Sequence, residues 1–130
     1  PVQDFILTDV DGTEITADIL AEPSPVLLVF MYNINSADTE CMEAIRTLAD
    51  AAFAKGWYVY GVSASPFSQI EEVRHQFQLP FDFLQGDEKV IKTAIRANPV
   101  IMLLKEGVVL GNWSCAETPA FEEANARLGE

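Results

Sequence analysis

The feature that most constrains the fold is an uninterrupted apolar run, Val26–Phe30, followed by a helix-like pattern and a second apolar run at Trp57–Val62. Strands that are apolar at every position are typical of parallel sheets, because helices cover both faces of such sheets. Between the two runs, hydrophobic residues recur at helical spacing from Asn35 or Ser36, which can cap a helix, to Gly56, which can end one. The order strand, helix, strand predicts an α/β fold with a mostly parallel sheet.

The rest of the sequence continues this alternation and predicts a central mixed sheet of four or five strands flanked by helices. A short N-terminal β-hairpin is expected from Phe5–Leu7 and Glu14–Thr16, with Asp9–Thr13 as its turn. A second hairpin is expected where Glu106-Gly107 separates two apolar runs. We expect residues 1–130 to form a single domain. The other predicted elements are a helix from Ser65-Pro66, a strand at Phe81–Phe83, a helix at Glu88–Arg96 and a last helix after Thr118-Pro119.

The segment around Pro99 indicates a particular fold. Asn98-Pro99 precedes the apolar run Val100–Leu104, which leads through Lys105–Gly107 into Val108–Trp113. This order resembles the cis-proline loop and the terminal hairpin of the thioredoxin superfamily. The resemblance implies a thioredoxin-like fold in which Pro99 faces the amino terminus of the helix that bears the active cysteines in that superfamily.

The same resemblance gives the expected position of the active site. The best match to the Cys-x-x-Cys motif is Asn35-Ser36-Ala37-Asp38, a few residues after Phe30. Neither Asn35 nor Asp38 can form a disulfide or a nucleophilic thiolate. The sequence therefore predicts a redox-inactive domain that acts by binding, with no catalytic residue, cofactor or metal. A protein or peptide is expected at the Asn35–Pro99 face, in a candidate groove that consists of Tyr32, Asn33, Arg96, Asn98 and Pro99.

A closer resemblance covers nearly the whole chain. It rests on Asp4–Asp9, Lys92–Pro99, Leu103–Gly107 and Asn112-Trp113-Ser114. These segments are similar to the soluble thioredoxin-like domains attached to bacterial DoxX-like integral membrane proteins. The resemblance implies a domain tethered to a helical membrane segment, on a side of the membrane that it does not specify. The absence of an initial Met agrees with a piece of a larger, membrane-anchored protein.

The two cysteines support an alternative function. Cys41 lies on the apolar stripe with Ile45 and Leu48, where a thiol is expected to behave as a small buried hydrophobe. Cys115 follows the last predicted strand and is expected in an exposed loop, where a thiol reacts more readily. The alternative is a single-cysteine thiol redox or peroxide-handling domain that uses Cys115 or Cys41. A bridge between them would require Cα atoms within about 7 Å, which the sequence does not show.

A second alternative comes from Asp9-Val10-Asp11-Gly12-Thr13, which resembles the first motif of haloacid-dehalogenase-type phosphatases. There Asp9 would be the nucleophile and Asp11 the acid/base. The objection is that such a site needs further carboxylates around Mg²⁺, and Ile91 stands where one is expected. Acidic residues in a hairpin turn explain the segment more simply.

The charge of the chain excludes one class of partner. Twenty acidic and eight basic side chains give a net charge of −12, so the domain repels phosphate backbones and is not expected to bind nucleic acid. One histidine, His75, and two scattered cysteines do not make a zinc signature.

Overall fold

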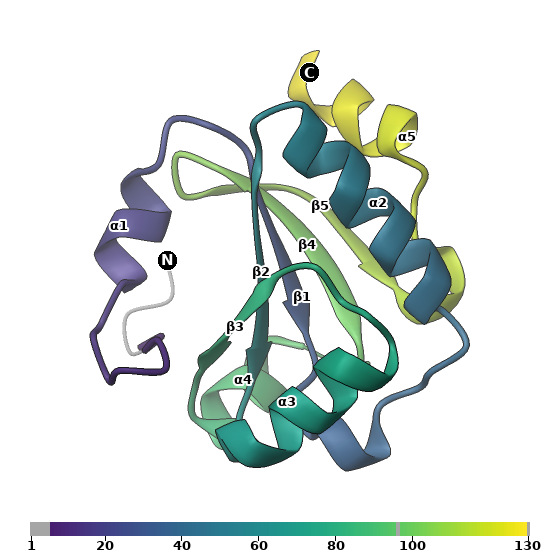
Figure 1. The fold of residues 1–130 in the computed structure, drawn as a ribbon. Coiled ribbons are helices and arrows are strands. Elements are labelled where there is room, and N and C mark those ends of the chain that lie inside the picture. Colours follow the sequence, from purple (N-terminus) through teal and green to yellow (C-terminus); the bar gives the residue numbers. More distant parts are fainter. Residues whose placement is uncertain (1–5, 96, 130) are drawn as a thin grey trace.

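The chain forms a five-stranded mixed sheet with helices on both faces (Figure 1). A computed structural model describes residues 6–95 and 97–129. The strands are β1 Val26–Phe30, β2 Tyr58–Ser63, β3 Asp82–Gln85, β4 Val100–Lys105 and β5 Val108–Ser114. The helices are α1 Thr16–Ala21, α2 Met42–Ala54, α3 Phe67–Gln76, α4 Glu88–Ala94 and α5 Phe121–Ala126, with 3₁₀ turns at Ile34–Ser36, Cys115–Glu117 and Arg127–Gly129.

The strand order is β3-β2-β1-β4-β5, so the apolar strand β1 lies at the centre of the sheet. β1, β2 and β3 run parallel, whereas β4 pairs antiparallel with β1 and with β5. Parallel neighbours need a crossover helix, and α2 and α3 supply these connections. This arrangement confirms the predicted α/β architecture with a mixed sheet and a C-terminal hairpin.

Alternate residues of β1 enter two separate hydrophobic cores. Leu27 and Val29 pack with side chains of α2, α3 and α5, whereas Leu28 and Phe30 pack with side chains of α1 and α4. All five residues of β1 are buried, because a strand points successive side chains to opposite faces and both faces are covered. The apolar run in the sequence therefore reflects burial on two sides.

The first long helix begins later than predicted, at Met42 instead of Asn35 or Ser36. Asn33 Oδ1 accepts a hydrogen bond from Asn35 N–H, and Asp38 Oδ1 accepts one from Glu40 N–H. Such local side-chain bonds compete with the helical hydrogen-bond pattern. They hold the segment before Met42 in a 3₁₀ turn and a loop, so Cys41 occupies the N-cap position of α2.

The predicted N-terminal hairpin is reduced to a single antiparallel bridge between Thr8 and Glu14. The return strand ends early, because Thr16 begins α1 and its Oγ1 accepts a 2.8 Å hydrogen bond from Leu7 N–H. Thr8 also bridges Gln85 at the edge of the sheet. Phe5 lies outside the described residues.

Candidate functional site

Cys41 and Cys115 are joined by a disulfide bond, and their Cα atoms lie 5.4 Å apart. Cys41 is 5% exposed and packs in the core on the α2 face, as expected for a small hydrophobe. Cys115 begins the 3₁₀ turn after β5 and is partly exposed. The two cysteines, which the sequence alone did not pair, therefore form one disulfide between a buried and a partly exposed residue.

The register of the sheet brings the two cysteines together. Phe30, the last residue of β1, pairs with Val100 at the start of β4, and Val100 pairs with Ser114 at the end of β5. Cys115 therefore follows β5 at the same end of the sheet at which the chain leaves β1 toward α2. Cys41 lies near this end because it directly precedes the first residue of α2.

The amino terminus of α2 places partial positive charge near Cys41. Unpaired backbone N–H groups at a helix start carry partial positive charge, which favours a thiolate there. α2 has 13 residues, so its dipole is well developed. Acidic neighbours act in the opposite direction, since Glu40 precedes Cys41 and Glu43 lies in the first turn of the helix.

The segment that matches Cys-x-x-Cys lies beside the proline loop, and Asn98 ties the two together. Asn98 Nδ2 donates to Asn33 O at 2.8 Å and to Ser36 Oγ at 3.3 Å, and Asp38 N–H donates to Asn98 O at 2.9 Å. The Asn98–Pro99 peptide bond is cis. Asn98 Oδ1 is buried and has no hydrogen-bond partner among the described residues. The predicted active-site segment is thus a loop that hydrogen bonds hold to the proline loop. Its exposed residues Asn35 and Ser36 carry no thiol.

The remaining residues of the predicted groove have the following neighbours. Asn33 O accepts a hydrogen bond from Asn98 Nδ2, and Lys92 Nζ lies 5.0 Å from the centroid of the Tyr32 ring. Pro99 is buried, and Arg96 lies outside the described residues. A protein or peptide partner at the Asn35–Pro99 face stays a prediction, and any such partner would find the Asn98 carbonyl already bonded to Asp38.

The phosphatase hypothesis is wrong, because the fold places Asp9 in a turn. Asp9 Oδ1 accepts hydrogen bonds of 2.9 Å from Asp11 N–H and from Thr13 N–H. A nucleophilic aspartate would follow a central strand, whereas the residue before Asp9 forms only isolated bridges at the sheet edge. Within residues 6–95 and 97–129, no three His, Cys, Asp or Glu side chains gather so that they could hold a metal ion.

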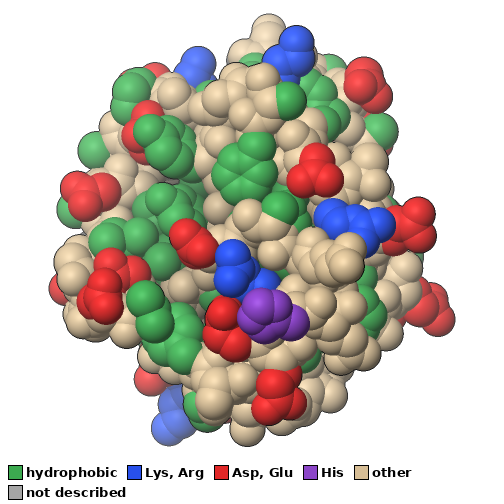
Figure 2. Space-filling model, viewed as in Figure 1, with side chains coloured by type: hydrophobic (Ala, Val, Ile, Leu, Met, Phe, Trp, Pro, Cys, Tyr) green, Lys and Arg blue, Asp and Glu red, His purple; other side chains and the backbone are tan. Residues whose placement is uncertain are grey.

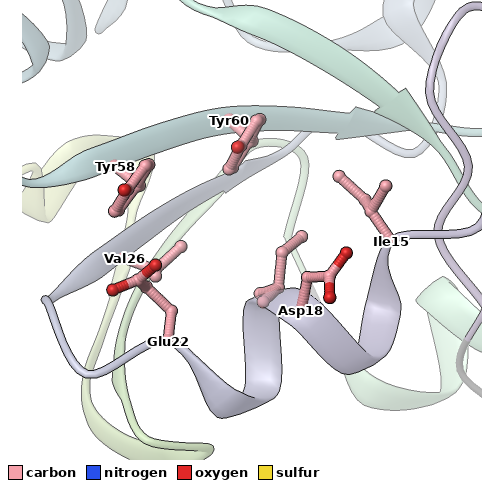
Figure 3. A pocket seen from close by; sticks show the side chains of 7 residues that line it. Ile15, Asp18, Glu22, Val26, Tyr58 and Tyr60 are labelled. Atoms are coloured by element: carbon pink, nitrogen blue, oxygen red, sulfur yellow. The ribbon is translucent and has the colours of Figure 1, made fainter.

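A further hollow, on the opposite face of the sheet, does not involve the cysteines. Figure 3 shows it between α1 and β2, where Asp18 and Glu22 face Tyr58 and Tyr60, and its volume is about 250 Å³. Burial raises the pKa of Tyr60, and the nearby charges of Asp82, Glu22 and Asp18 add to the shift. This hollow adjoins the α1 and α4 core, on the far side of the sheet from the disulfide.

The strand order and the helices on both faces of the sheet give a thioredoxin-like fold, with a disulfide at the amino terminus of its first crossover helix. No protein-family model matches the sequence, and no curated protein matches it. Solved structures do match. The thioredoxin domain of a thiol-disulfide oxidoreductase from Bacteroides vulgatus is 15% identical, with a TM-score of 0.71 over 93% of this chain and 90% of that chain.

Two further structures cover both chains almost completely. StoA from Bacillus subtilis is 15% identical, with a TM-score of 0.66 over 98% of this chain and 99% of that chain. A secreted disulfide oxidoreductase from Mycobacterium tuberculosis is 16% identical, with a TM-score of 0.68 over 98% of this chain and 96% of that chain. At these identities the similarity establishes the thioredoxin-like fold.

The prediction of a redox-inactive domain is wrong. It rested on the empty Cys-x-x-Cys position and on two unrelated cysteines, whereas Cys41 and Cys115 form a disulfide. Of the three functions considered from the sequence, the thiol redox alternative agrees best with the structure, although the structure shows a pair of cysteines instead of a single one. No signal in the sequence joins residues that are 74 positions apart.

Proposed function

We propose that this chain is a thiol–disulfide exchange domain that uses the Cys41–Cys115 pair. The observation that carries the proposal is the position of the disulfide, with Cys41 at the N-cap of α2 and Cys115 partly exposed at the end of β5. The names of the similar structures support it, since they include thiol-disulfide and disulfide oxidoreductases. The redox centre would thus lie at the start of α2, a few residues after the vacant motif, and be completed by a second cysteine that follows β5.

The geometry favours one direction of attack. A substrate thiolate attacks Sγ of Cys115, the more exposed sulfur, and forms a substrate–Cys115 mixed disulfide while the Cys41–Cys115 bond breaks. Cys41 leaves as a thiolate at the helix amino terminus, where partial positive charge stabilises it. The second thiolate of a dithiol substrate then attacks the substrate sulfur of the mixed disulfide and releases Cys115. The substrate is oxidised to a disulfide, and the pair takes up its two electrons and two protons.

The proposal predicts that the folded domain equilibrates with dithiols. Dithiothreitol should reduce the pair without denaturant, and the reduced protein should return to the disulfide in oxidised glutathione. Mass spectrometry after alkylation measures both forms. Cys41→Ala and Cys115→Ala should each abolish two-electron exchange, because a single thiol stops at the mixed disulfide.

A control distinguishes a disulfide that exchanges in the folded protein from a structural cross-link. Reduction should be measured by the same alkylation assay in native buffer and in denaturant. A pair that resists dithiothreitol until the chain unfolds would be a structural cross-link, and that result would overturn the proposed function.

We further propose, from the resemblance to DoxX-associated domains, that this domain is tethered to a membrane protein. Among the described residues, no helix is long and apolar enough to cross a membrane. The support for a tether is therefore the sequence similarity around Lys92–Pro99 and Asn112-Trp113-Ser114. An antibody against the domain should detect the natural protein in the membrane fraction of its source cells after a high-salt wash. Detection only in the supernatant would contradict the tether.

A further inference from the structure

A groove of about 610 Å³ runs beside the disulfide, between the outer face of α2 and the segment that leads into α5. α2 and α5 lie side by side in the upper part of Figure 1. Glu40 lines the groove and directly precedes Cys41. On the other wall Thr118 lines it, and Thr118 Oγ1 donates a 2.7 Å hydrogen bond to the carbonyl oxygen of Cys115. The groove is thus bordered by a residue adjacent to Cys41 and by one hydrogen-bonded to Cys115, while neither cysteine is among its lining residues.

The floor of the groove is apolar and its rim is acidic. Leu48, Pro119 and Phe121 contribute apolar surface, while the rim includes the exposed carboxylates of Glu43 and Glu122. Among the residues that the structure describes, no lysine or arginine lines it. Acidic side chains are spread over the face of the molecule shown in Figure 2, and the chain carries a net charge of −12.

We propose that this groove binds the segment of a basic polypeptide that flanks its reactive cysteine. The inference rests on the proposed exchange function, and it adds the substrate class. An apolar floor can hold the aliphatic stems of lysine or arginine while their charged ends meet the glutamates on the rim. The attacking thiolate would then approach Cys115 from the wall that contains Thr118. A thiol in an acidic polypeptide would be repelled by the same carboxylates.

The proposal is tested with two synthetic peptides of equal length that each contain one cysteine. Lysines flank the cysteine in the first peptide, and glutamates flank it in the second. Mass spectrometry after acid quenching gives the rate at which each forms a mixed disulfide with the oxidised domain. Each rate is divided by the rate of the same peptide with 2-hydroxyethyl disulfide, which removes differences in intrinsic thiol reactivity. At low salt the normalised rate should favour the basic peptide about tenfold, and 0.5 M salt should bring the ratio close to one.

Two double variants identify the groove as the source of the preference. Glu43→Gln/Glu122→Gln should reduce the ratio to about threefold or less, because it removes two rim charges. Glu14→Gln/Glu72→Gln removes two exposed carboxylates outside the groove and should leave the ratio unchanged.

The outcomes distinguish the two proposals. Equal normalised rates for both peptides, with dithiothreitol still able to open the disulfide, would overturn the groove proposal and leave the exchange function in place. The same loss of preference in both double variants would assign it to net charge and would also overturn the groove. A disulfide that no thiol opens in the folded protein would overturn the exchange function itself.

Discussion

Loss of the Cys41–Cys115 disulfide is expected to lower the free energy of unfolding by about 4 kcal/mol. The bond closes a loop with a sequence separation of 74 residues, and closure of a long loop removes much conformational entropy from the unfolded chain. For a domain of this size the melting temperature should fall by roughly 15 °C. Chemical denaturation of the Cys41→Ala/Cys115→Ala variant, compared with the oxidised protein, measures the change.

The reduced wild-type protein is the matched control for this variant. Its unfolding free energy should agree with that of the double alanine variant to about 1 kcal/mol, because both lack the cross-link. If oxidised and reduced wild-type proteins unfold at the same denaturant concentration, the expectation is contradicted. In that case the disulfide would not raise the free energy of unfolding.

Gly61→Ala is expected to destabilise the domain by about 3 kcal/mol, because the new methyl group would overlap the ring of Phe83. Gly61 lies in β2 between β1 and β3, paired with Val29 on one side and Phe83 on the other. The Phe83 ring is 5% exposed and packs close to Phe81, so it has little room to move. Thermal and chemical denaturation of the variant measure the loss.

Gly129→Ala provides the control for this substitution. A Cβ at Gly129 would meet no atom within 4 Å, so its expected effect is within about 0.5 kcal/mol. Similar stabilities for the two alanine variants would show that the Phe83 ring repacks easily, and the predicted overlap would then be wrong as a source of destabilisation.

The fold could be predicted from the sequence because its elements have strong local signals. The run Val26–Phe30 predicts a strand buried on both faces, and Glu106-Gly107 predicts the turn between β4 and β5. Gly107 indeed has a positive φ of 78°, which the turn requires. The start of α2 could not be placed, since the bonds of Asn33 and Asp38 to nearby backbone N–H groups depend on the loop conformation.

The candidate site was harder to predict than the fold, because it depends on strand register. Cys41 was correctly expected to be buried, and Cys115 to follow the last strand. Their pairing requires Ser114 to stand opposite Val100 and Val100 opposite Phe30. A shift of β5 by one residue would reverse the face of each side chain, and no local pattern specifies that register. The resemblance to the Cys-x-x-Cys motif instead predicted the site at Asn35–Asp38.

The disulfide also determines how this domain would respond to mechanical force. It encloses α2 through β5, whereas α1 and β1 lie outside the closed loop. A chain pulled from its two ends could therefore extend to about 200 Å, against about 450 Å without the cross-link. Extraction of β1 would remove the central strand from between β2 and β4. Tension would thus destroy the native sheet, while the disulfide would keep the ends of the segment 41–115 joined under load.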